Sequence, residues 1–206
     1  DKHVVIIGGG DTGADCLGTA HRQGAASIHQ FEIMSRPPDE RPSGNPWPTW
    51  PMIYRVSSAH EEGGVREYAI TTEEFVGEEG RLTTLRTRRV EQLLVDGRIT
   101  FEPIEGSEED YPADLVLLAM GFTGPERGPL LDGLGVDLDD RGNVARDRDF
   151  GTSVDNVWVC GDMGRGQSLI VWAIAEGRSC AAAVDRHLTG DTTLPSPVDA
   201  AAQPMR

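Results

Sequence analysis

The most constraining feature of the sequence is a short aliphatic run followed at once by a glycine-rich turn. Residues 4–7 read Val-Val-Ile-Ile, and residues 8–13 read Gly-Gly-Gly-Asp-Thr-Gly. A continuous aliphatic run predicts a strand buried on both faces, as in a parallel sheet. Apolar residues at Ala14, Leu17 and Ala20 predict a helix over residues 14–23 that ends at Gly24. Residues 27–34 predict a second strand, so the chain opens with a β-α-β unit and an α/β fold is expected.

The spacing Gly8-x-Gly10-x-x-Gly13 matches the dinucleotide-binding fingerprint. Gly8 permits the tight turn, Gly10 lets the backbone approach a pyrophosphate, and Gly13 lets helix and strand pack closely. With Gly9, Asp11 and Thr12, these residues present N–H groups and a positive helix end to a diphosphate. A merely glycine-rich turn is the alternative, but the position between a strand and a helix favours a nucleotide site.

A carboxylate that binds the adenosine ribose is expected about twenty residues after the last glycine. Glu32 lies nineteen residues after Gly13 and would favour NADH, because a carboxylate repels a 2′-phosphate. Arg36 and Arg41 follow closely and would bind that phosphate if their loop folds back. A solvated charge at the end of a strand is the other interpretation of Glu32. The choice between NADH and NADPH therefore stays open.

The middle of the chain contains a proline-rich segment followed by segments in which apolar and polar residues alternate. Residues 35–50 are rich in proline, include Trp47 and Trp50, and predict an ordered excursion without helix or central strand. Each tryptophan is either a packing anchor or a contact to another subunit. Residues 66–75, 82–90 and 98–103 alternate apolar and polar side chains and predict a small antiparallel meander.

The last third predicts a second nucleotide-type element. Buried strands are expected at residues 114–120 and 156–160, a helix at residues 167–188, and a loose tail after Gly190. Gly161 and Asp162 end the second of these strands, and the helix begins near Gln167. An aspartate there can bind a chain of sugar-like hydroxyls, but a simple turn explains the pattern equally well.

Composition and charge exclude several classes of protein. Acidic residues outnumber basic residues 34 to 19, and the net charge of −15 disfavours nucleic-acid binding. No apolar run approaches the roughly 20 residues of a membrane span. Cys16, Cys160 and Cys180 form no C-x-x-C pair, which argues against a disulfide scaffold, a zinc site and a thiol–disulfide reductase and fits a cytoplasmic setting. The five histidines are scattered, and no metal site or catalytic histidine is expected.

The sequence resembles the glutamate synthase small (beta) subunit, a flavoprotein with two dinucleotide-binding domains. The similar strings are GTAHRQGA at residues 18–25, FEIMSRPPDERPSGNPWPTWP at 31–51, SSAHEEGGVREYAI at 57–70, ADLVLLAMGFTGPE at 113–126, and VWVCGDMGRGQSLIVWAIAEGRSCAAAVDRHL at 157–188. Together with the glycine motif, they extend over nearly the whole chain in the same order.

The resemblance implies an NAD(P)H-binding domain at residues 1–112, the C-terminal lobe of an FAD domain at 113–190 and a tail at 191–206. Gly161 and Asp162 would contact the ribityl and pyrophosphate region of FAD, and Gln167, Ser168 and Leu169 would face its isoalloxazine ring. Ala119, Met120 and Gly121 would lie on the strand where the two domains meet.

The same resemblance implies hydride transfer from NAD(P)H to FAD, with no catalytic side chain required. Electrons would continue through iron–sulfur clusters in an N-terminal region to a glutamate synthase large subunit. The chain begins in a strand without an initiator Met, so we expect it to be a fragment. It has no FAD-type glycine fingerprint of its own and is expected to bind FAD weakly and to be inactive alone.

Two other functions remain open. A related flavoprotein would pass electrons to a different acceptor. A nucleotide-binding regulatory module would bind NAD(P)H without turnover, although the CGDMGRGQS segment at residues 160–168 argues against it, because a nucleotide sensor needs no second site facing a flavin.

Overall fold

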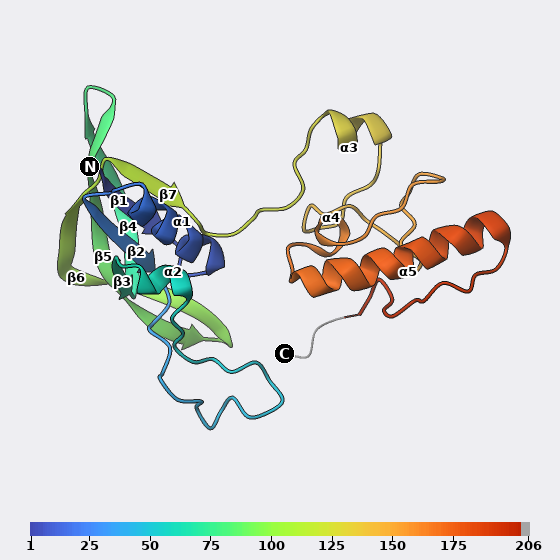
Figure 1. Cartoon of the computed structure of the whole chain (residues 1–206), viewed down its shortest axis with the longest axis horizontal. Coiled ribbons are helices and arrows are strands. Elements are labelled where there is room, and N and C mark those ends of the chain that lie inside the picture. The colour runs from blue at the N-terminus through green and yellow to red at the C-terminus, as the bar shows by residue number, and fades with distance from the viewer. Residues whose placement is uncertain (203–206) are drawn as a thin grey trace. The chain divides into compact units, whose positions relative to one another are not determined.

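The computed structural model describes residues 1–202 and divides the chain into two compact units, Asp1–Gly121 and Phe122–Arg206 (Figure 1). The division falls between residues 121 and 122, whereas the sequence suggested a boundary between residues 112 and 113. Strand β7 (Leu115–Leu118) therefore belongs to the first unit, where it pairs with β1. The assignment of the two parts to NAD(P)H and FAD remains a prediction.

The first unit is built on a four-stranded parallel sheet in the order β3-β2-β1-β7. Strand β1 (His3–Ile7) lies in its interior, between β2 (Ser27–Glu32) and β7. Helix α1 (Asp11–Arg22) connects β1 to β2, as the sequence predicted. The expected α/β fold with a parallel sheet is confirmed.

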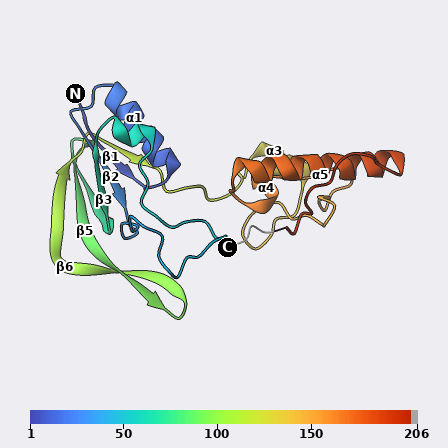
Figure 2. The same ribbon diagram turned by 60° about the horizontal axis from the view of Figure 1, so that its bottom comes forward.

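Alternate residues of β1 point into two different cores, which explains why the whole run is aliphatic. Val4 and Ile6 pack with Leu17 of α1, on the helical side of the sheet. Val5 packs on the opposite side with Ile70 and the fully buried Leu85 of the antiparallel sheet. The parallel sheet thus lies between a helical layer and an antiparallel layer (Figures 1 and 2).

The expected meander has three strands, but its first strand was placed wrongly. Residues 66–75 are divided at Ala69, whose φ of +56° turns the chain from one sheet into the other. Strand β3 (Val65–Tyr68) pairs in parallel with β2, while β4 (Ile70–Glu78) pairs antiparallel with β5. The alternation of side chains continues across the turn, so periodicity alone does not reveal it.

The two remaining strands of the antiparallel sheet are longer than predicted. Strands β5 (Arg81–Val95) and β6 (Arg98–Pro112) form a long bent hairpin, visible in Figure 2. Asp96 and Gly97 connect them with positive φ angles, as their sequence indicates.

Residues 33–57 form the excursion expected from their prolines, without helix or strand, before the short helix α2 (Ser58–Glu61). Asn45 organises this loop, because its amide donates to the Thr49 hydroxyl and the Trp50 carbonyl and accepts from the Met52 N–H. Trp47 and Trp50 are 83% and 69% exposed and are therefore not packing anchors of this unit.

The described residues of the second unit form three helices: α3 (Pro129–Leu134), α4 (Asp162–Arg165) and α5 (Ile170–Thr189). The strand expected at residues 156–160 is absent from the described part of this unit, where Trp158 forms one isolated bridge to Gly151. Residues 150–152 pair with this segment on one side, through the Val159 N–H to the Phe150 carbonyl and the Thr152 N–H to the Val157 carbonyl, but this pairing amounts to one antiparallel bridge and not to a strand. Helix α5 begins three residues later than expected, with Leu169 as its N-cap residue.

The predicted loose tail is anchored as far as it is described. The N–H of Val198 donates to the Ser179 hydroxyl of α5, and the carbonyls of Ala200 and Ala202 accept from Arg146 and Arg165. Residues 203–206 of the predicted tail lie outside the described residues. Among residues 1–202, no helix combines the length and apolar character that crossing a membrane requires.

Candidate dinucleotide-binding site

The glycine loop lies between β1 and α1, and the structure shows why three of its positions are occupied by glycine. A Cβ on Gly13 would lie 2.2 Å from the Gly8 carbonyl oxygen, and a Cβ on Gly8 would lie 2.1 Å from that of Ala119. Gly8 also has a φ of +128°. Gly10, the N-cap residue of α1, has no atom within 4 Å of its Cβ position. Gly8 and Gly13 are thus required by packing, whereas Gly10 faces open space that a phosphate could enter.

Two side chains of β2 hold a single peptide group of this loop. The Gln30 amide donates to the Gly8 carbonyl at 2.8 Å, and Glu32 Oε2 accepts from the Gly9 N–H at 2.8 Å. The other carboxylate oxygen of Glu32 accepts from the Met34 N–H at 3.0 Å. The Gly8–Gly9 peptide is therefore fixed at both its carbonyl and its N–H end, and Glu32 is first of all a support of the loop.

A cleft of about 740 Å³ opens beside the loop, within the usual size range for small-molecule sites. Apolar side chains of Phe31, Ile70 and Phe75 form part of its wall. The structure brings most of the predicted nucleotide residues to this cleft: Gly8, Gly9, Gly10, Asp11, Thr12, Glu32, Ala119, Met120 and Gly121. Gly13 packs beneath the loop instead.

A second cleft of about 490 Å³ shares Gly9, Gly10, Asp11 and Glu32 with the first and is rich in arginine. The guanidinium of Arg36 lies 3.9 Å from the centre of the Tyr54 ring, and that of Arg66 lies 4.9 Å from it. Arg66 also donates to the Tyr54 hydroxyl at 3.1 Å. Two cations therefore face one aromatic ring in this cleft.

Arg36 and Arg41 have different surroundings. Arg36 lines the arginine-bearing cleft and forms an ion pair with Asp39 at 2.7 Å. Arg41 donates to the carbonyls of Asn45 and Thr49 within the excursion. Of the two arginines near Glu32, only Arg36 is in a position to approach a nucleotide in this cleft.

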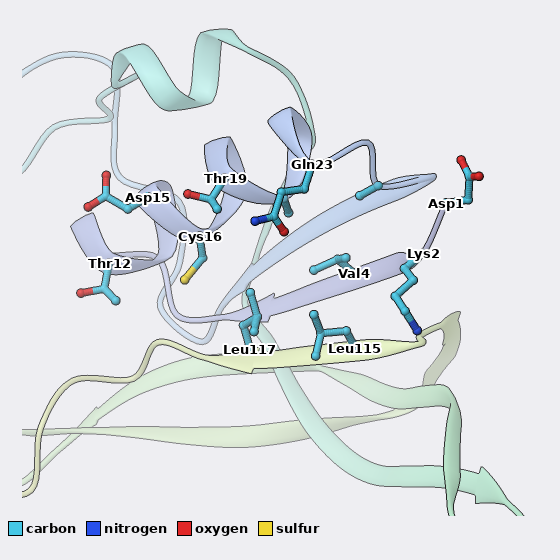
Figure 3. Close-up of a pocket in the computed structure, with 12 residues that line it drawn as sticks. Asp1, Lys2, Val4, Thr12, Asp15, Cys16, Thr19, Gln23, Leu115 and Leu117 are labelled. Carbon is cyan, nitrogen blue, oxygen red and sulfur yellow. The ribbon is translucent and has the colours of Figure 1, made fainter.

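A third hollow, of about 410 Å³, lies between α1 and β7 (Figure 3). Cys16, Val4, Leu115 and Leu117 give it a largely apolar lining. Thr12 lines both this hollow and the large cleft.

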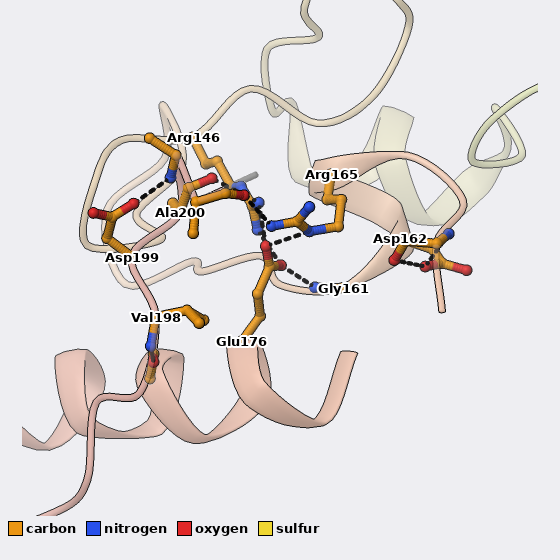
Figure 4. A network of polar contacts seen from close by, with 12 residues as sticks. Arg146, Gly161, Asp162, Arg165, Glu176, Val198, Asp199 and Ala200 are labelled. Carbon is orange, nitrogen blue, oxygen red and sulfur yellow. Dashed lines mark hydrogen bonds and ion pairs between the residues drawn. The ribbon is translucent and has the colours of Figure 1, made fainter. Parts of the chain in front are cut away.

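In the second unit, the buried carboxylate of Glu176 holds the Gly161 turn (Figure 4). It is fully buried, accepts from the Gly161 N–H at 2.8 Å, and pairs with Arg146 at 2.8 Å and Arg165 at 2.7 Å. Burial opposes ionisation of Glu176, but the hydrogen bonds from the two arginines and Gly161 outweigh it and lower its pKa. A charged Glu176 thus fixes the chain where the second nucleotide-type signal occurs.

The remaining predicted residues cluster around the connection between α4 and α5. One carboxylate oxygen of Asp162 accepts from the N–H and hydroxyl of Ser168, both at 3.1 Å. Gln167 donates to the Phe122 carbonyl at 2.9 Å, and Leu169 is 68% exposed. Asp162 and Ser168 are thus paired with each other on the surface of the unit.

Comparison with protein families gives a match between residues 1–177 and pyridine nucleotide-disulphide oxidoreductases. The chain belongs to this family. Among curated proteins, it is 63% identical to the glutamate synthase [NADPH] small chain of Mycobacterium tuberculosis over 205 residues, which cover all of this chain and 41% of that protein.

Other curated relatives of the present chain are also named as glutamate synthases. The identity is 43% to the glutamate synthase [NADPH] small chain of Bacillus subtilis, across 94% of this chain and 41% of that protein. It is 48% to glutamate synthase [NADH] of Saccharomyces cerevisiae, across 95% of this chain and 10% of that protein. The chain thus spans well under half the length of these relatives.

A solved thioredoxin reductase from T. acidophilum has the same fold. It superposes with a TM-score of 0.60 at 22% identity, covering 91% of this chain and 53% of that one. At this identity the likeness concerns the fold alone. All three cysteines of the present chain are free.

Several residues of the site were missed by sequence reasoning. Gln30 had one available signal, since it is a polar residue between the apolar Ile28 and Phe31 of a buried strand. Tyr54 and Arg66 lie twelve residues apart in irregular and strand segments, and no spacing rule connects them. Glu176 lies within a helix, where a buried acidic residue cannot be distinguished from a solvated one without its partners.

Proposed function

We propose that this chain is the electron-input part of a glutamate synthase small subunit, binding NADPH in its first unit and part of FAD through its second. The observation that carries the proposal is the open position of Gly10 at the start of α1, next to a cleft of about 740 Å³. The glycine loop and helix end would hold the diphosphate. The identity to the named small chains supports the same function.

The arginine-bearing cleft favours NADPH over NADH. Arg36 follows the end of β2, and Arg66 lies on β3 beside Gln30; both line the cleft that Glu32 lines, and an arginine in this region is the usual receptor of a 2′-phosphate. Both carboxylate oxygens of Glu32 already accept backbone N–H groups, which disperses the negative charge that would repel that phosphate. Tyr54 stacks with both guanidiniums, and so would hold Arg36 and Arg66 in place for the phosphate.

The FAD assignment rests on the turn from Gly161 to Leu169. Asp162 and Ser168 would bind hydroxyl groups of the cofactor, and the start of α5 would face its ring. Leu169, Ile170 and Val171 are each at least 60% exposed, an apolar surface of the kind that covers a ligand or another chain segment. A second strand–glycine–helix fingerprint is absent from the described residues, so this unit would hold only part of FAD.

The nicotinamide and the flavin would supply the hydride-transfer chemistry when bound, and the chain would orient and shield them. Iron–sulfur clusters elsewhere in the small subunit, a large-subunit partner that forms glutamate, and a cytoplasmic setting belong to the same proposal.

Calorimetric titration of the 206-residue chain with NADPH and NADH, each with and without FAD, tests the proposal. We expect a micromolar dissociation constant for NADPH, about −8 kcal/mol, and weaker binding of NADH. FAD is expected to bind weakly. A folded chain that binds neither nucleotide would contradict the proposed function, and equal affinities would contradict the role of the arginines.

A further inference from the structure

A chain of hydrogen bonds connects the glycine loop to a histidine of α2. Gln30 is 2% exposed, and its amide nitrogen donates to the Gly8 carbonyl. Its amide oxygen lies 2.9 Å from Nε2 of His60. His60 Nδ1 lies 3.2 Å from the backbone nitrogen of Ser57 and 2.9 Å from its hydroxyl oxygen. A surface turn is thus linked through a core side chain to the loop.

In each hydrogen bond of this series, the donor and the acceptor follow from the groups at its two ends, the Ser57 N–H and the Gly8 carbonyl. The backbone N–H of Ser57 can only donate, so Nδ1 of His60 accepts and Nε2 carries the hydrogen. Nε2 then donates to the Gln30 oxygen, which leaves the Gln30 NH₂ group facing the Gly8 carbonyl, an obligate acceptor. His60 therefore selects the amide orientation that the loop requires.

We propose that His60, acting through Gln30, is a positioning residue that sets the glycine loop for dinucleotide binding; this inference rests on the proposed nucleotide function of the loop. The Gly8–Gly9 peptide is fixed by Gln30 on one side and Glu32 on the other. If the Gln30 contact is lost, the peptide keeps one restraint and the N–H groups after it lose their fixed direction.

The charged groups around His60 support its neutral form. Burial lowers its pKa, and Arg66 of β3 lowers it further, while Asp11 of α1 has the opposite effect. Glu32, Arg36, Arg55 and Tyr68 line the same cleft. A neutral imidazole is the form in which Nδ1 accepts and Nε2 donates, so these surroundings maintain the hydrogen-bond directions described above.

The experiment uses the 206-residue chain with His60→Ala, His60→Gln and Gln30→Glu. Glutamine at position 60 keeps a donor toward Gln30. Glutamate at position 30 keeps the shape but cannot donate to Gly8. His3→Ala is the matched control, because it removes a 2.7 Å contact between a histidine and Ser27 at the opposite end of β1 and β2. NADPH affinity, thermal midpoint, and hydrogen exchange of the peptide containing residues 8–13 are measured for each.

We expect His60→Ala and Gln30→Glu to weaken NADPH binding roughly tenfold and to accelerate exchange in residues 8–13, as for loss of one buried hydrogen bond. His60→Gln should recover much of both, and His3→Ala should change neither. Wild-type affinity and exchange in folded Gln30→Glu and His60→Ala would overturn the inference. Failure of the wild-type chain to bind NADPH would instead contradict the proposed function, and the exchange comparison would still decide the positioning role.

Discussion

At the scale of single residues, substitutions at Gly10 and Gly13 distinguish an effect on nucleotide binding from an effect on folding. A methyl group at Gly10 meets nothing within 4 Å, so Gly10→Ala should leave the thermal midpoint nearly unchanged. It would occupy the space through which a pyrophosphate approaches, and we expect NADPH affinity to fall roughly tenfold or more. Gly13→Ala places a methyl 2.2 Å from the Gly8 oxygen and should cost about 2 kcal/mol of folding free energy. Calorimetry and thermal unfolding of both variants check this. Equal midpoints would contradict the packing role of Gly13.

Arg36 and Arg41 form a matched pair for testing nucleotide choice. Arg36→Ala should weaken NADPH binding by roughly tenfold or more and leave NADH binding unchanged, because hydrogen bonds to charged groups contribute about 1.5–3 kcal/mol. Arg41→Ala removes the same side chain from a site that contacts only loop carbonyls, and should affect neither affinity. Competitive titration with both nucleotides gives the ratio. A loss of NADH affinity in Arg36→Ala would assign this arginine to the shared part of the two cofactors.

The residues also show how far the sequence could be used to predict the site. Gly8 and Gly13 were predictable because a side chain at either position would collide with backbone, and Gly10 because a bound pyrophosphate would need its open space; the spacing of the motif encodes all three. Gln30 and His60 meet in space across thirty residues of chain, and only their tertiary contact reveals a role. The spacing predicted that Glu32 lies at the nucleotide site, but not that its carboxylate accepts a hydrogen bond from the Gly9 N–H.

At the scale of elements, α5 depends on a single buried carboxylate. Glu176→Ala would leave Arg146 and Arg165, which are 7% and 11% exposed, without their partner. Removal of one member of a buried ion pair costs about 3–5 kcal/mol, so we expect the second unit to lose most of its stability. The control is Asp149→Ala in the same unit, which breaks an exposed pair with Arg186 and should cost less than about 1 kcal/mol. Urea unfolding measures both. Similar losses in the two variants would show that burial of Glu176 contributes little.

The same carboxylate predicts the acid sensitivity of this unit. The folded-state pKa of Glu176 is lowered from 4.5, so its ionised form stabilises the fold above that pH. This stabilisation is lost as the pH falls through the lowered value, because the unfolded chain binds a proton first. We expect the thermal midpoint of the second unit to decline below pH 4.5 in the wild-type chain. Glu176→Gln removes this titrating group and should make the decline shallower, as calorimetry at several pH values would record.

The elements that sequence reasoning predicted well are those specified by local patterns. Strand β1, helix α1 and strand β2 follow from an aliphatic run, helical spacing and Gly24. The division between β3 and β4 at Ala69 depends on which sheet each half joins, and the alternation is the same for both. The apolar residues 156–160 resemble a strand, yet in the described chain they form only one isolated antiparallel bridge, to Gly151.

At the scale of the whole molecule, the two units have separate hydrophobic cores. Val5, Leu85 and their neighbours belong to the first unit, and Leu131, Val144 and Phe150 are core residues of the second. The predicted nucleotide residues divide in the same way, since the glycine loop lies in Asp1–Gly121 and the Gly161 turn in Phe122–Arg206. A ligand of one site therefore stabilises one core directly.

Calorimetry of the whole chain can separate these two sites. If NADPH binds only the first unit, one of two unfolding transitions should rise with NADPH concentration, by about 2.7 kcal/mol of stability at one hundred times the dissociation constant. The other transition should not move. Glu176→Gln should identify that second transition by shifting it in the absence of nucleotide, and Gly10→Ala should reduce the NADPH-dependent shift of the first. A single transition would mean that the two units unfold together, and equal shifts of two transitions would mean that NADPH stabilises both units.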